Sequence, residues 1–225
     1  MSEMENPYAG PFPVTQVSTS DRIAFLRKTY SLVLLGIVVF AATISASADV
    51  SFIQNLAAGL WASPWIAIIV LLGSAFAVRA LARTPGIGLV GYLAYAFLLG
   101  LFLAQPVYHA GGDVTRQAGV LTFCIFSGLT AYVFVTKKDF SFLGGILGIC
   151  LFAMIGIAIC GLLFGIQMGT WFSVLGAMLF SGYILYDTSK IMKQHSPSEA
   201  LPAAIELFVD IVMLFWYLLS LFNRE

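Results

Sequence analysis

The chain has 225 residues, of which 60% are hydrophobic and only 10% are charged, and its formal net charge is zero. A soluble domain of this size must wet its exterior and would build its core from amphipathic, not uniformly apolar, segments. This composition therefore excludes an ordinary soluble globular protein and predicts an all-α integral membrane protein in contact with the lipid bilayer. The sequence has no basic tract suited to nucleic acid. Cysteine and histidine are not spaced for zinc or haem, so we expect no cofactor.

Residues 1–20 are polar and contain Pro7, Pro11 and Pro13. Such a composition cannot bury enough apolar surface to order itself, so we predict a disordered cytoplasmic tail. A positively charged stretch followed at once by an apolar core is missing here, so we expect no cleavable signal peptide. The remaining residues, 21–225, are expected to form a single seven-helix transmembrane domain.

Seven apolar segments are close to the length of about 20 residues that a membrane-spanning helix needs. In chain order they are Tyr30–Ser47, Pro64–Val78, Ile87–Val107, Ala118–Val135, Phe142–Gly165, Thr170–Ile191 and Pro202–Phe222. Turn-forming residues separate them, including Ala110–Asp113 between the third and fourth segments.

The basic residues are divided unequally between the two sides of the predicted bundle. Two of them, Arg116 and Arg224, fall on one side. The other side holds nine, namely Arg22, Arg27, Lys28, Arg79, Arg83, Lys137, Lys138, Lys190 and Lys193. Because positive residues stay on the cytoplasmic side, this distribution predicts a cytoplasmic N-terminus.

Asp187 and Asp210 lie inside the last two apolar segments. A carboxylate in hydrocarbon costs about 2.5–3.5 kcal/mol even on lenient insertion scales, so such residues usually face a cavity, a partner or an ion path. Glu206 shares a helix face with Asp210 because the two are four residues apart. We expect all three acids in one pocket near the cytoplasmic side, with Arg79 as the basic residue within reach.

A close pair of aspartates has predictable chemistry. At about 4 Å and an effective dielectric near 20, two unit charges repel by about 4 kcal/mol. Asp187 and Asp210 should therefore share one proton and titrate as a unit, which makes a pH-dependent latch between their helices. A doubly ionised pair would attract a cation. Calcium prefers six to eight oxygens, so the pair predicts weak, transient calcium binding.

Structural alternatives exist for each acid. Asp187 could be an interfacial carboxylate that pairs with Lys190. Asp210 could form a structural salt bridge with Arg79 or another buried partner. Glu206 could simply be solvated.

The chain has two histidines, and His195 lies in the polar loop between the last two segments. A loop histidine is expected to be solvated, with modulation of the latch as the alternative. His109 lies on the opposite side and is expected to be uninvolved.

Three enzymatic or photochemical readings are disfavoured. An intramembrane aspartyl protease needs Gly-x-Gly-Asp at its second aspartate, where this chain has Leu207–Asp210. A rhomboid-like serine protease needs Gly-x-Ser-Gly with a membrane histidine, and the last apolar segment lacks the lysine of a retinal protein. We expect a protein that is not an enzyme.

Four runs of the chain match the motifs of one family in their residues and in their order. They are Ala131–Phe134, Thr136–Gly145, Tyr186–Ile191 and Leu207–Phe215. They resemble the bacterial Bax inhibitor/YccA branch of the transmembrane Bax inhibitor motif family, and the likeness covers nearly the whole chain beyond the tail.

The resemblance implies a seven-helix bundle with the last helix at its centre. It also implies that Asp187 and Asp210 occupy the paired-aspartate positions of members regarded as pH-sensitive calcium leaks. An arginine on the second helix partners the pair in some members, and Arg79 is the candidate here. The second segment carries no acid, so Glu206 is the candidate substitute.

Two functions follow as expectations. The first is a bacterial inner-membrane protein that passes calcium or protons under control of the aspartate pair. The alternative is a non-transporting modulator and substrate of the membrane-anchored ATP-dependent protease FtsH, engaged through the N-terminal tail.

Overall fold

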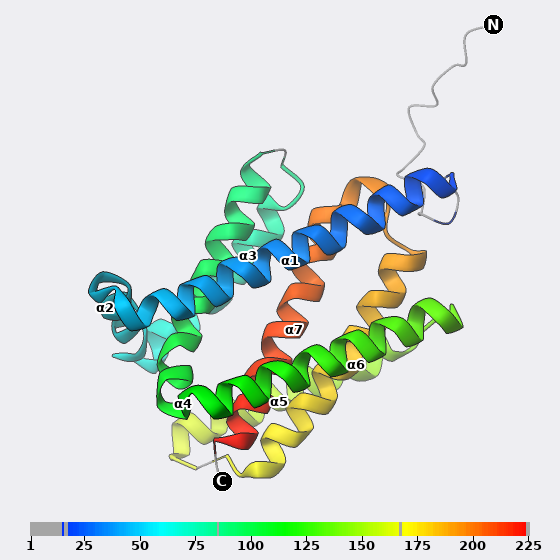
Figure 1. The fold of residues 1–225 in the computed structure, drawn as a ribbon. Coiled ribbons are helices and arrows are strands. Elements are labelled where there is room, and N and C mark those ends of the chain that lie inside the picture. Colours follow the sequence, from blue (N-terminus) through cyan, green and yellow to red (C-terminus); the bar gives the residue numbers. More distant parts are fainter. Residues whose placement is uncertain (1–14, 16–17, 85, 167, 224–225) are drawn as a thin grey trace, which may run out of the picture.

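The computed structural model describes residues 15, 18–84, 86–166 and 168–223. Over these residues every long regular element is a helix and none is a strand (Figure 1). The described part of the chain thus confirms the all-α class. The predicted disordered tail, residues 1–20, lies almost wholly outside the described residues.

Each predicted apolar segment lies within one of the described helices, apart from a single residue at each end of the segment Phe142–Gly165. The helices are α1 (Thr19–Asp49), α2 (Ser51–Trp61), α3 (Pro64–Leu81), α4 (Ile87–Thr136), α5 (Leu143–Phe164), α6 (Thr170–Lys193), a 3-10 turn η2 (Pro197–Glu199) and α7 (Ala200–Phe222). Helix α1 begins well before its segment, and α4 contains two segments. Only α2 was not predicted. Its eleven residues are too short to span a bilayer, and it packs against α4 and α1.

Length and composition mark four of the described helices as able to cross a membrane: α1, α4, α5 and α7 with η2. The pair α2 and α3, bent by 104°, would make a fifth. These spans establish a multi-pass membrane protein. Helix α6 is less apolar because it carries Asp187 and Lys190 among several hydroxyl side chains.

Helix α4 contains both the third and the fourth predicted segments, where the sequence suggested a loop at Ala110–Asp113. The helix instead breaks at a single residue, Gly111, whose φ of 81° and ψ of 168° are non-helical. Glycine adopts a positive φ without steric cost, so one residue is enough to redirect the chain. Figure 1 shows the two arms of α4 diverging at this break.

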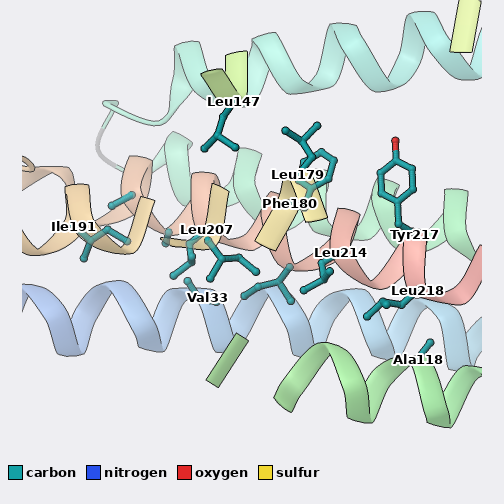
Figure 2. Close-up of a cluster of buried hydrophobic side chains, with 14 of the residues drawn as sticks. Val33, Ala118, Leu147, Leu179, Phe180, Ile191, Leu207, Leu214, Tyr217 and Leu218 are labelled. Carbon is teal, nitrogen blue, oxygen red and sulfur yellow. The ribbon is translucent and has the colours of Figure 1, made fainter. Parts of the chain in front are cut away.

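Helix α7 is the most buried of the four candidate spans. Of its apolar window 61% is buried, compared with 22% for α1 and 17% for α5. It packs against α6, α4 and α1. Figure 2 shows Leu207, Leu214 and Tyr217 of α7 among side chains of α1, α5 and α6. Most of the described residues of α7 are therefore enclosed by other helices.

Glycine lets α6 approach its neighbours closely. A Cβ atom added at Gly176 would lie 2.3 Å from the ring of Tyr217 on α7, and one at Gly144 of α5 would lie 2.8 Å from the ring of Tyr186 on α6. Lipid tails are as apolar as leucine, so helices in a bilayer associate through close packing and polar contacts. These two glycines let α5 and α7 pack closely against α6.

Candidate functional site

Asp187 of α6 and Asp210 of α7 meet inside the bundle. Their exposed fractions are 6% and 5%. The two carboxyl groups are close enough for a side-chain hydrogen bond when one of them carries a proton. Oδ2 of Asp210 is buried and has no hydrogen-bond partner among the described residues. The site therefore holds an acid pair with one oxygen still unsatisfied.

Lys190 is the basic partner of this pair. It lies one turn after Asp187, and its Nζ is 3.6 Å from Asp187 Oδ1. The same Nζ donates a hydrogen bond of 2.8 Å to Glu206 Oε2 on α7. The ammonium also lies 5.3 Å from the centre of the Tyr186 ring. Lys190 thus bridges acids of both helices, so Glu206 is paired rather than merely solvated.

The short connection between α6 and α7 brings these residues to one end of the bundle. Ser196 and Glu199 form a capping box, in which the backbone N–H of Ser196 donates to Glu199 Oε2 at 3.2 Å. Pro197 occupies the first position of the 3-10 turn, where its missing N–H costs nothing. The chain consequently reverses within a few residues, and α6 and α7 run as antiparallel neighbours.

His195 is buried, where a loop histidine was expected to be solvated. Its exposed fraction is 8%. Nδ1 lies 3.4 Å from Glu199 Oε2, and Nε2 lies 3.4 Å from Glu206 Oε2. The reason is the tight reversal, which folds the loop back over the end of α7. The i,i+4 spacing of His195 and Glu199 was the one sequence signal that could have indicated this.

Arg79 is not brought to the aspartate pair. It is exposed on α3, a helix that packs on α4 and α2, and it lies near Tyr95. Among the described residues no ion pair joins Arg79 to an acid. The position expected for a basic residue of α3 is instead taken by Lys190 of α6, which lies one turn after Asp187 on the same helix.

The connection between α4 and α5 docks on the same end of α6. The Phe140 N–H donates to Ser189 Oγ at 3.0 Å, and Asp139 Oδ2 lies 3.8 Å from Lys193 Nζ. The Ser141 N–H donates to Asp139 Oδ1 at 2.9 Å. This backbone hydrogen bond lowers the pKa of Asp139 from its ordinary value. The polar end of the bundle is thus assembled from three segments of the chain.

The acid cluster does not resemble a resident metal site. Within the described residues no group of three or more His, Cys, Asp or Glu is arranged to hold a metal ion. Asp187 and Asp210 supply at most four carboxylate oxygens, fewer than the six to eight that calcium prefers. Their transient binding of calcium stays a prediction, whereas proton exchange needs only the two carboxyl groups.

Comparison with known proteins connects this arrangement to one family. The family described as "Inhibitor of apoptosis-promoting Bax1" matches residues 22–225. The chain belongs to the Bax inhibitor family. This confirms the family inferred from the sequence motifs, and the match includes the whole of α6 and α7.

Relatives of this Bax inhibitor family protein occur in animals, fungi and bacteria. Protein lifeguard 4 of Mus musculus is 35% identical over 97% of this chain and 92% of its own length. Bax inhibitor 1 of Schizosaccharomyces pombe is 30% identical over 98% of this chain and 85% of its own length. An uncharacterized protein of Campylobacter jejuni is 29% identical over 98% of this chain and 97% of its own length. The likeness therefore extends over nearly the full length of each protein.

Proposed function

We propose that this Bax inhibitor family protein is a pH-sensitive leak for calcium or protons, gated by Asp187 and Asp210. The observation that carries the proposal is the burial of two neighbouring carboxyl groups on facing helices, with Asp210 Oδ2 lacking a partner among the described residues. Ionisable groups inside a membrane bundle mark ion or proton paths more often than they serve packing.

The pair can act as a latch because its protonation state changes the force between α6 and α7. With one shared proton the two carboxyl groups attract each other through a hydrogen bond. With none, they repel by about 4 kcal/mol at about 4 Å and an effective dielectric near 20. Helix α6 packs more extensively on α7 than any other two elements pack on each other. A change from attraction to repulsion between the two carboxyl groups therefore acts on the most extensive helix–helix interface among the described elements.

Loss of the shared proton also makes the site attractive to cations. Asp187, Asp210 and Glu206 then carry three negative charges against the single positive charge of Lys190. Two uncompensated charges in a buried site draw a cation from the aqueous side. Because the oxygens are too few for tight calcium coordination, the cation would pass and not stay.

We further propose seven spans with a cytoplasmic N-terminus, residues 21–225 acting as one domain, and a YccA-like place in a bacterial inner membrane. The nine-to-two distribution of basic residues supports this orientation. The break at Gly111 supports counting α4 as two spans. In this topology Lys190, Lys193 and His195 lie at the cytoplasmic end of the bundle, so the latch responds to cytoplasmic pH.

The test is calcium flux into liposomes that hold the purified protein, measured across pH. Wild-type flux should change with pH, and Asp187→Asn and Asp210→Asn should each reduce that change by about tenfold or more. Asp113→Asn is the matched control, because Asp113 is an exposed acid whose one ion pair among the described residues is with Arg116. Equal, pH-dependent flux in the wild type and both variants of the pair would refute the gating role.

The alternative function, modulation of the FtsH protease, depends on residues 1–20 and can be tested separately. Ser18 Oγ accepts a hydrogen bond from the Asp21 N–H and caps α1. Deletion of residues 1–17 therefore removes most of the tail and keeps the cap. The alternative predicts slower turnover of the truncated protein by the protease, while Asp187→Asn leaves turnover as in the wild type. Unchanged turnover after the deletion would exclude engagement through the tail.

A further inference from the structure

A continuous series of charged side chains connects the aspartate pair to the surface of the protein. Each member lies within 4 Å of the next, and acids alternate with bases. In order they are Asp187, Lys190, Glu206, His195, Glu199 and Arg83. The proposed latch uses only the first three of these residues, and the alternative role expected for His195 was modulation of that latch.

One oxygen atom in this series has two competing partners. Glu206 Oε2 accepts from Lys190 Nζ at 2.8 Å and lies 3.4 Å from His195 Nε2. His195 Nε2 is buried and makes no hydrogen bond to any described residue. The 3.4 Å separation is within ion-pair distance, so a positively charged His195 would attract Glu206 Oε2. The charge of His195 therefore decides how completely Glu206 is available to Lys190.

We propose that His195 is a positioning residue that sets the pH at which the Asp187–Asp210 pair exchanges its proton, acting through Glu206 and Lys190. The proposal rests on the proposed gating function and names the group that tunes it. His195 contacts neither aspartate, so it acts through the two residues between them and, when protonated, through the field of its own charge.

The charges between His195 and the aspartate pair determine whether protonation of His195 raises or lowers the pH at which the pair loses its proton. When His195 gains a proton, the imidazolium competes with Lys190 for Glu206 Oε2. Lys190 is then freer to approach Asp187, whose Oδ1 is already 3.6 Å away. A closer ammonium stabilises the ionised form of the pair. A protonated His195 therefore lets the pair lose its proton at a lower pH than it otherwise would.

The other charged groups around His195 come from every element packed on it. Glu199 of η2 and Glu206 of α7 face its two nitrogens directly. Its backbone N–H donates to the carbonyl of Lys190 on α6 at 3.0 Å. Arg83 lies beyond Glu199, at 3.3 Å, and a surface cavity is lined by Lys28 of α1 together with these two residues. Both direct neighbours of His195 are therefore acids.

The first test is the pH profile of flux in His195→Gln. Glutamine keeps a polar side chain of similar reach but cannot gain a proton. The midpoint of the pH response should rise by about one pH unit, since a unit charge is lost near the pair. His109→Gln is the matched control, because His109 is the other histidine of the chain and lies on α4. A midpoint that stays the same in His195→Gln would overturn the proposal.

A second test needs no transport. The imidazole nitrogens of His195 are titrated by NMR in the wild type, in Glu206→Gln and in Asp187→Asn. The His195 midpoint should fall by about one pH unit in Glu206→Gln and by less in Asp187→Asn, while the His109 signal keeps its midpoint. Identical His195 midpoints in all three proteins would refute the coupling. If the His195 midpoint shifts in the variants but the wild-type protein shows no flux, the proposed leak function is rejected, and the coupling between His195 and Glu206 stands.

Discussion

Lys190 of α6 donates a hydrogen bond of 2.8 Å to Glu206 of α7, and this bond crosses between the helices beside the buried aspartate pair. The lysine side chain is 20% exposed and that of Glu206 is 29% exposed, so the ion pair is only partly screened by solvent. The same ammonium lies 3.6 Å from Asp187. Lys190 therefore compensates negative charge on both helices at once.

Replacing Lys190 by methionine should destabilise the bundle by about 2 kcal/mol. The change removes the cation and leaves Asp187 and Glu206 as uncompensated acids, and breaking a buried pair from one side is costly. Thermal unfolding of the detergent-solubilised protein measures the loss. Lys193→Met is the control, because Lys193 lies 3.8 Å from a half-exposed Asp139 and should contribute well under 1 kcal/mol.

A double-mutant cycle separates the ion pair from the packing of the lysine stem. In Lys190→Met with Glu206→Gln, the second change removes the acid that the first left unpaired. We expect the double variant to lose less than the sum of the two single losses by about 1 kcal/mol. Strictly additive losses would mean that the 2.8 Å contact contributes nothing to stability.

Gly176→Ala should destabilise the contact between α6 and α7 by about 1–3 kcal/mol. The added Cβ would lie 2.3 Å from the ring of Tyr217, so the helix or the ring must move. Chemical or thermal unfolding in detergent reports the loss. Gly148→Ala provides the comparison, since a Cβ there meets nothing within 4 Å and should leave stability equal or higher by up to about 1 kcal/mol.

The connection between α4 and α5 should respond to acid through Asp139. Because its pKa is lowered below the ordinary value of 3.8, the carboxylate form stabilises the docked loop above that pH. The contribution is lost only as the pH falls through the lowered pKa, in strong acid. The amide signal of Ser141, which donates to Asp139 Oδ1, should titrate with a midpoint below 3.8. Asp139→Asn should abolish this step.

Single cysteines report the proposed topology. In a variant whose three cysteines, Cys124, Cys150 and Cys160, are replaced by serine, Gly112→Cys and Lys138→Cys are labelled separately with a membrane-impermeant maleimide. Gly112 lies next to the break in α4, and Lys138 follows its C-terminus. Intact cells should label Gly112→Cys alone, and inverted vesicles Lys138→Cys alone. Labelling of both from the same side would rule out the orientation proposed here.

Most of the helical arrangement could be predicted from composition, because a bilayer leaves a helix as the simplest way to satisfy every backbone polar group. The turn-forming residues Ala110–Asp113 also indicated a break between two segments. A loop was expected there, but in the structure the single residue Gly111 redirects the helix. Helix α2 was missed because eleven residues carry no spanning signal of their own.

The sequence by itself determined that Asp187 and Asp210 lie within apolar helices, and that Glu206 shares a face with Asp210, since helical periodicity follows from spacing alone. Only the tertiary structure decided the partners. Lys190 stands beside the acids where Arg79 was expected, and His195 is enclosed by two glutamates where solvent was expected. Both depend on which helices pack together and how tightly the α6–α7 connection turns. Local spacing indicated only the Lys190–Asp187 and His195–Glu199 pairs, because contacts between helices depend on long-range packing.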